Sequence, residues 1–65
     1  MGIYHKNDLR KISQHGLNKM VNIHTKDLGA YYISESYPSK QSDIDETIEN
    51  IHILKSVIEE KEINR

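Results

Sequence analysis

The last third of the chain carries five apolar residues at helical spacing, and no proline or glycine lies between them. They are separated by four, three, three and four residues: Ile44, Ile48, Ile51, Leu54 and Ile58. This spacing puts all five on one side of an α-helix. The sequence therefore predicts a long amphipathic helix that must find apolar cover elsewhere.

The start of this helix has the residues of a helix N-terminus. Residues 38–42 are a polar linker, and Ser42 with Asp45 resembles a capping box in which Asp replaces the usual Glu. Acidic side chains in the first turn also suit the positive end of the helix dipole. Nothing interrupts the helix before about Lys61, so we expect one continuous element.

A second, narrower apolar strip runs down the back of the predicted helix. At about 100° per residue, Ile53 lies roughly 160° from Ile51, and Val57 follows it four residues later. A helix with two apolar sides needs two covers. We expect Asn50, Ile53 and Val57 to contact either a second copy of the chain or a protein target.

The middle of the chain has two interpretations, of which a β-hairpin is the first. Residues 21–25 alternate apolar and polar side chains, and residues 31–33 are aromatic or β-branched, which favours strands. Between them, residues 27–29 form a three-residue loop closed by Gly29. This register brings Ile23 opposite Ile33 on the face that would pack against the helix.

The second interpretation makes residues 17–36 helical. Before this region, Asn7 or Asp8 can cap a short helix over residues 8–15 that Gly16 ends. The predicted fold is therefore α+β, with a short N-terminal helix, a β-hairpin and a long amphipathic C-terminal helix. The alternative is an all-α helical hairpin or bundle.

The length of the chain limits its stability. With 65 residues it forms one small domain, whose large apolar residues are mainly ten isoleucines and four leucines. A domain of this size buries only about 60% of the surface that its unfolded chain exposes. It has no cysteine, so no disulfide adds stability. We therefore expect self-association into a homo-oligomer, with a homodimer as the simplest form.

The two halves of the chain carry opposite charge. Residues 33–65 hold eight acidic and four basic residues, whereas residues 1–32 hold two acidic residues and five basic ones: Lys6, Arg10, Lys11, Lys19 and Lys26. These five residues are the candidate contacts of an alternative function, a small nucleic-acid-binding transcriptional regulator. A pI near 6.4 is low for a dedicated nucleic-acid binder.

Catalytic, metal and cofactor motifs are not found. The four histidines lack metal-ligand spacing, and Glu49 with His52 supplies only one E-x-x-H pair. There is no cysteine nucleophile, no G-x-S-x-G elbow and no glycine-rich phosphate loop. We therefore expect neither an enzyme nor a bound metal or cofactor.

These exclusions leave protein binding as the predicted function. We expect a small non-enzymatic regulator or inhibitor, and Tyr32 and Tyr37 give it a second candidate interface because tyrosine often anchors interfaces. No apolar run approaches membrane-spanning length, and the N-terminus lacks a signal-peptide core, so we expect a complete cytoplasmic protein without a membrane partner. The residue usage suggests a bacterial or phage origin.

Overall fold

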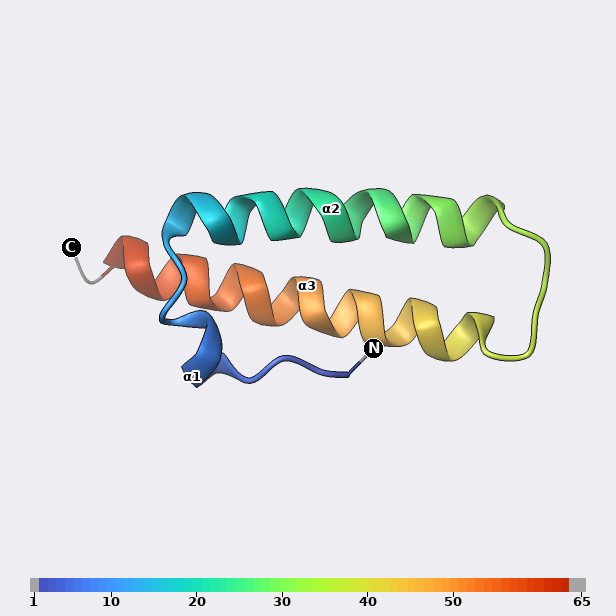
Figure 1. Ribbon diagram of the computed structural model, residues 1–65, viewed down its shortest axis with the longest axis horizontal. Helices are drawn as coiled ribbons and strands as arrows, with labels where there is room; N and C mark the ends of the chain where they lie inside the picture. Colours follow the sequence, from blue (N-terminus) through green and yellow to red (C-terminus); the bar gives the residue numbers. More distant parts are fainter. Residues whose placement is uncertain (1, 64–65) are drawn as a thin grey trace.

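The structure is a computed structural model that describes residues 2–63, and it contains three α-helices. They are α1 (Lys6–Leu9), α2 (Gln14–Ile33) and α3 (Lys40–Ile63). Helices α2 and α3 lie side by side and antiparallel, joined by residues 34–39 (Figure 1). Helix α1 packs on α3 at the end away from that connection.

The predicted α+β fold is wrong, because the described part of the chain contains no strand. Residues 21–33, where the β-hairpin was expected, lie inside α2. Gly29 does not have the positive φ that a hairpin turn would need. The all-α helical hairpin, the alternative interpretation, is the fold that the chain adopts.

The N-terminal helix also has different bounds from those predicted. Helix α1 is a single turn, Lys6–Leu9, and the chain enters α2 at Gln14. The reason is a cap, since the Ser13 hydroxyl accepts a hydrogen bond of 3.1 Å from the Gly16 N–H. Gly16 is therefore in the first turn of α2 and does not end a helix.

Helix α2 turns a side of mixed polarity toward α3. Its two buried residues, Leu17 and His24, are seven positions apart, or nearly two full turns. Val21 and Leu28 lie half-buried on the same side. Ile23, which the hairpin prediction placed in the core, is 57% exposed on the outside of the helix.

The predicted C-terminal helix is confirmed, but it begins earlier. Helix α3 starts at Lys40, so the last three residues of the predicted linker 38–42 are helical and Ser42 is not a cap. Its buried side differs from the predicted stripe. Asn50 and Val57 are fully buried, whereas Ile48, Ile51 and Ile58 are half-buried.

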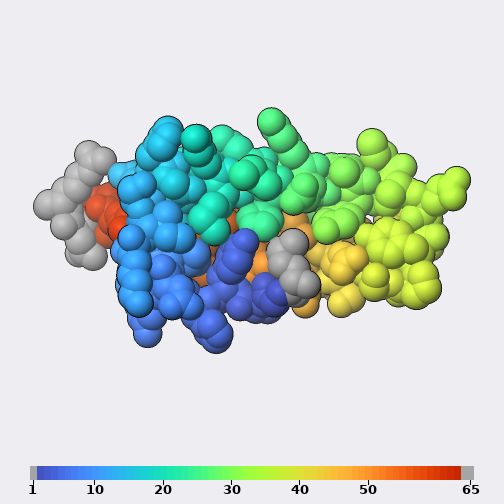
Figure 2. Space-filling model, viewed as in Figure 1, coloured from blue at the N-terminus to red at the C-terminus, as the bar shows by residue number. Residues whose placement is uncertain are grey.

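The N-terminal strap, residues 2–12, covers a second side of α3. Leu9 from the strap joins Leu17, Leu54 and Val57 in the core cluster. Figure 2 shows the strap in blue, lying in front of α3. Helix α3 thus has covers on two sides. The second cover is a segment of the same chain, whereas the sequence predicted a second copy or a protein target there.

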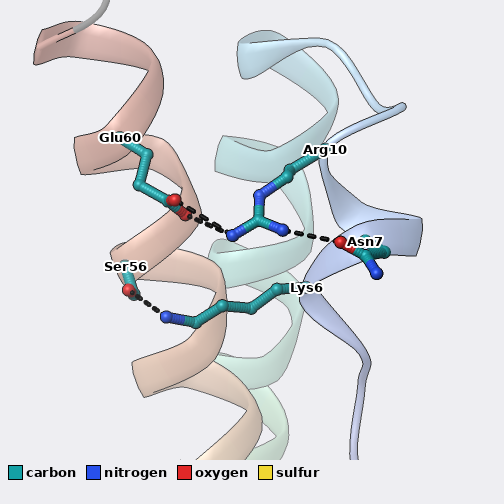
Figure 3. Close-up of polar contacts among 5 residues, drawn as sticks. All are labelled: Lys6, Asn7, Arg10, Ser56 and Glu60. Carbon is teal, nitrogen blue, oxygen red and sulfur yellow. Dashed lines mark hydrogen bonds and ion pairs between the residues drawn. The ribbon is translucent and has the colours of Figure 1, made fainter.

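Polar contacts fix α1 along α3 (Figure 3). The Lys6 ammonium donates to the Ser56 hydroxyl at 3.0 Å, and the Arg10 guanidinium forms an ion pair of 3.0 Å with Glu60. The Lys61 ammonium donates to the Arg10 carbonyl at 3.0 Å. These exposed contacts add at most about 1 kcal/mol each. They show that the basic and acidic halves meet within one chain.

Candidate protein-interaction site

Asn50, a predicted interface residue, lies at the centre of the contact between the strap and α3. Its side chain is fully buried. Its Oδ1 accepts a hydrogen bond of 2.9 Å from the Tyr4 N–H, and its Nδ2 donates one of 3.1 Å to the Gly2 carbonyl. One side chain therefore satisfies two backbone groups of the strap.

A second polar contact ties the strap to α2. The Tyr4 hydroxyl and His24 Nε2 share a hydrogen bond of 2.6 Å, and the two rings lie 5.5 Å apart. His24 is 6% exposed, and its Nδ1 has no hydrogen-bond partner among the described residues. The Asp27 carboxylate lies 4.0 Å from that nitrogen. Tyr4 thus joins the strap to both long helices.

The other residues of the back strip also face the interior. Val57 is fully buried in the core cluster, and Ile53 is half-buried against it. A partner reaches Asn50 or Val57 only after the strap moves away from α3. In the described conformation, the apolar surface that a partner can reach lies elsewhere.

The loop end of the hairpin carries the clearest exposed apolar surface. Tyr32 is 61% exposed and Ile33 is 88% exposed, and Tyr37 follows half-buried in the connection. We call Tyr32, Ile33 and Tyr37 the loop-end patch. Tyr32 and Ile33 are neighbours in the chain, whereas the other large exposed apolar residues of the described chain stand singly in the sequence: Ile3, Ile23 and Ile63.

Hydrogen bonds hold the connection that follows Tyr32 and Ile33 and contains Tyr37. The Ser34 hydroxyl donates to the Tyr31 carbonyl at 2.7 Å, and the Lys40 ammonium donates to the Ser34 carbonyl at 2.7 Å. The Ser39 hydroxyl donates to the Asp43 carboxylate at 3.2 Å. The end of α2 and the start of α3 are therefore linked by more than the backbone.

Tyr37 is part of the same arrangement. Partial burial raises the pKa of its hydroxyl above the ordinary value of 10.0, and a hydrogen bond to the Asp43 carboxylate together with the charge of that carboxylate raises the pKa further. The hydroxyl therefore stays protonated at neutral pH. It can hold Asp43 while its ring contributes apolar surface at the loop end.

Two of the five basic residues of the predicted nucleic-acid surface make contacts within the chain. Lys6 and Arg10 bind groups on α3, namely Ser56 and Glu60. The remaining three are exposed: Lys11, Lys19 and Lys26. Contacts to acidic α3 thus compete for two of the five charges that phosphates would need.

The described residues include no group of three or more His, Cys, Asp or Glu side chains that could hold a metal ion. None of the described helices has both the length and the apolar character that crossing a membrane requires. Comparisons with protein-family models, curated proteins and solved structures found no match to this chain.

Sequence reasoning missed two parts of this site. Ile33 was assigned to the inner face of a strand, although in a helix it falls seven residues after Lys26, on the solvent side. The pair formed by Tyr4 and His24 joins residues twenty positions apart and leaves no local pattern. If residues 14–33 are assigned to a helix, helical geometry alone places Ile33 on the solvent side.

Proposed function

We propose that the protein is a small non-enzymatic regulator or inhibitor that acts by docking its loop-end patch onto another protein. The observation that carries this proposal is the exposure of two adjacent large side chains, Tyr32 at 61% and Ile33 at 88%. Covering a fully exposed isoleucine is favourable by about 1.5–3 kcal/mol. Tyrosine adds a hydrogen-bonding group to an apolar anchor.

The surroundings of the patch support a docking role. Glu35 and Ser36 are exposed beside it and give it a polar rim. The bonds from Ser34 and Lys40 restrain the connection before any partner arrives. A restrained surface loses less conformational entropy on binding, which leaves more of the contact energy for affinity.

A protein that regulates its target by covering a site on it needs only a binding surface such as the loop-end patch. A bound chain of this size blocks or reshapes the site that it covers, and no chemistry by its own residues is required. We expect this to take place in the cytoplasm of a bacterial or phage-infected cell. The partner is a protein that offers an apolar pocket for one isoleucine and one tyrosine.

Affinity capture with matched variants tests the proposal. Full-length tagged protein is exposed to lysate of the source cells, with and without nuclease, alongside a Tyr32→Ser/Ile33→Ser variant. Ile23→Ser is the control, since it removes an isoleucine that is 57% exposed outside the patch. We expect one partner to be retained by the wild type and the control and lost by the patch variant.

Two outcomes would overturn the proposal. A partner that binds the patch variant as well as the wild type docks elsewhere. If the captured material is lost after nuclease treatment and its binding weakens steeply as the salt concentration rises, the protein binds nucleic acid through residues such as Lys19 and Lys26.

A further inference from the structure

The strap has two parts that are held in different ways. Residues 6–12 contain α1 and are anchored by Leu9, which is 2% exposed in the core cluster. Residues 2–5, which we call the strap tip, contain no helix and run along α3 as an extended segment (Figure 1). Three of the four residues of the tip are exposed, and Tyr4 is half-buried. The attachment of the tip therefore depends on the groups that bind Tyr4 and the backbone beside it.

Asn50 recognises the backbone of the strap tip. Its Oδ1 accepts from the Tyr4 N–H at 2.9 Å, and its Nδ2 donates to the Gly2 carbonyl at 3.1 Å. The side-chain amide thus spans the two peptide groups that flank residue 3. Every peptide offers a carbonyl and an N–H at these places unless proline follows residue 3. Asn50 therefore fixes the position of a bound segment and does not select its sequence.

The site makes few demands on the first two side chains of the tip. A methyl group built on Gly2 meets no atom within 4 Å, and Gly2 does not have a positive φ. Alanine could therefore stand there without a clash or a strained backbone. The Ile3 side chain is 44% exposed, so residue 3 is not enclosed either.

The third residue of the tip is recognised as tyrosine. The Tyr4 ring packs against the core cluster, and its hydroxyl shares a hydrogen bond of 2.6 Å with Nε2 of His24. His24 is only 6% exposed. Phenylalanine would fill the same space but would leave this buried nitrogen without its partner, which is unfavourable. The site therefore selects tyrosine through its hydroxyl.

We propose that Asn50 and His24 form a binding site for a tyrosine-containing extended segment of another protein, and that the strap tip occupies this site as an internal ligand. The segment that fits has two residues of little restricted identity followed by tyrosine. Asn50 belongs to α3 and His24 to α2, so the site exists only in the folded hairpin.

The tip keeps the site closed until another segment displaces it. Because the tip and the site belong to one chain, the tip acts at an effective concentration that is about millimolar for a short tether. Displacement of the tip leaves α1 in place, since Leu9 and the contacts of Lys6 and Arg10 with α3 lie beyond it. The contact between tip and site is thus autoinhibitory.

Titration of the full-length Tyr4→Pro chain with a peptide tests the site. Proline has neither the N–H that binds Asn50 nor the hydroxyl that binds His24, so the tip leaves the site. The probe is the acetylated peptide Gly-Ile-Tyr-His, and NMR follows the Asn50 side-chain amide and the His24 ring. We expect both signals to shift. The wild-type chain should bind the probe about tenfold more weakly or less, because its own tip competes.

Altered probes and variants separate the contacts. Phenylalanine in place of the peptide's tyrosine should weaken binding about tenfold, whereas alanine in place of its glycine should change binding by less than about twofold. Adding Asn50→Asp to the Tyr4→Pro chain removes the donor to the peptide carbonyl and should weaken binding about tenfold. Tyr32→Phe in the same background is the control, since Tyr32 belongs to the loop-end patch.

Hydrogen exchange in the wild-type chain is an independent measurement. A tip that behaves as a ligand leaves without unfolding the helices, so the Tyr4 amide should exchange about tenfold faster or more than the amide of buried Leu54. Equal rates, or a Tyr4→Pro chain without helical circular dichroism, would show that the tip is an integral part of the core and would overturn the proposal.

The titration itself can also refute the site. A helical Tyr4→Pro chain that does not bind the probe has no such site. Equal affinity for the tyrosine and phenylalanine peptides would contradict recognition by His24. Equal affinity of the wild type and the Tyr4→Pro chain would place the peptide elsewhere on the molecule. Each of these results leaves the proposed function intact, because docking through Tyr32 and Ile33 does not use the tip.

Discussion

Replacing Gly29 by alanine tests the central element of the fold, because helix and hairpin predict opposite signs. Gly29 lies inside α2 without a positive φ, and a methyl group built on it meets no atom within 4 Å. Only helix propensity then separates the two residues, and alanine is better than glycine by about 0.8–1.0 kcal/mol. For a domain of this size that corresponds to a rise in Tm of about 4–8 °C.

Gly16→Ala is the matched control in the same helix. Its added Cβ would lie 2.8 Å from Cγ2 of Ile12 and 3.4 Å from the Ser13 hydroxyl. Ile12 packs against the core cluster, so it has little room to move. The clash offsets the gain in propensity, and we expect an unchanged or lower Tm. The difference between the two variants thus follows from their surroundings.

Thermal unfolding followed by far-UV circular dichroism measures both variants. A Gly29→Ala protein that melts several degrees below the wild type would refute a continuous α2, because alanine resists the left-handed conformation that a hairpin turn imposes. Gly29→Val separates the two cases further. In a helix valine is slightly better than glycine, whereas at positive φ it costs about 1–2 kcal/mol.

Four further variants, one of them a control, test the buried contacts and the pH dependence of stability. Asn50→Ala should cost about 1–3 kcal/mol and speed hydrogen exchange at the Tyr4 amide, while Asn22→Ala, on the exposed side of α2, should be nearly neutral in urea unfolding. Leu17→Ala removes a fully buried side chain, so denaturant titration should show a loss of about 2–5 kcal/mol. The raised pKa of Tyr37 means that the folded state keeps this proton longer than the unfolded state. Stability should therefore fall as pH rises above 10.0, and less so in Tyr37→Phe.

The C-terminal helix could be predicted from sequence because its signal is local and long. Twenty-four residues without proline or glycine carry isoleucines at helical spacing, and they form α3. The charge asymmetry of the chain likewise anticipates the ion pair between Arg10 and Glu60. Features that repeat over several turns are robust to an error at any one position.

Helix α2 was only the second interpretation of the sequence, because a polar residue occupies its buried side. His24 lies where a helical pattern would call for an apolar residue, seven positions after Leu17. With His24 counted as solvent-exposed, residues 21–25 alternate and read as a strand. Its burial depends on Tyr4, twenty residues away, so no local window contains the reason. The propensity of Tyr31–Ile33 for strands was then overridden because these residues continue α2, which packs on α3 through Leu17 and His24.

The buried side of α3 was misjudged for the same reason. Thr47 and Asn50 look like solvent-facing residues, yet both are at most 1% exposed. The Thr47 hydroxyl donates to the Asp43 carbonyl at 2.8 Å, and Asn50 binds the strap. Each buried polar group has a partner, which makes its burial tolerable. For both Thr47 and Asn50, the sequence shows that the side chain is polar but does not show where its hydrogen-bond partner lies.

The burial of Asn50 also specifies how α3 is oriented. Turning α3 by about 60° would cover more of the half-buried Ile48 and Ile51 with α2. It would also pull Asn50 away from the Tyr4 N–H and the Gly2 carbonyl, at a cost of about 1–3 kcal/mol for each buried group left without a partner. That cost is comparable to what Ile48 and Ile51 would gain from fuller burial. Asn50 therefore keeps the strap in place, while Ile48 and Ile51 stay half-buried.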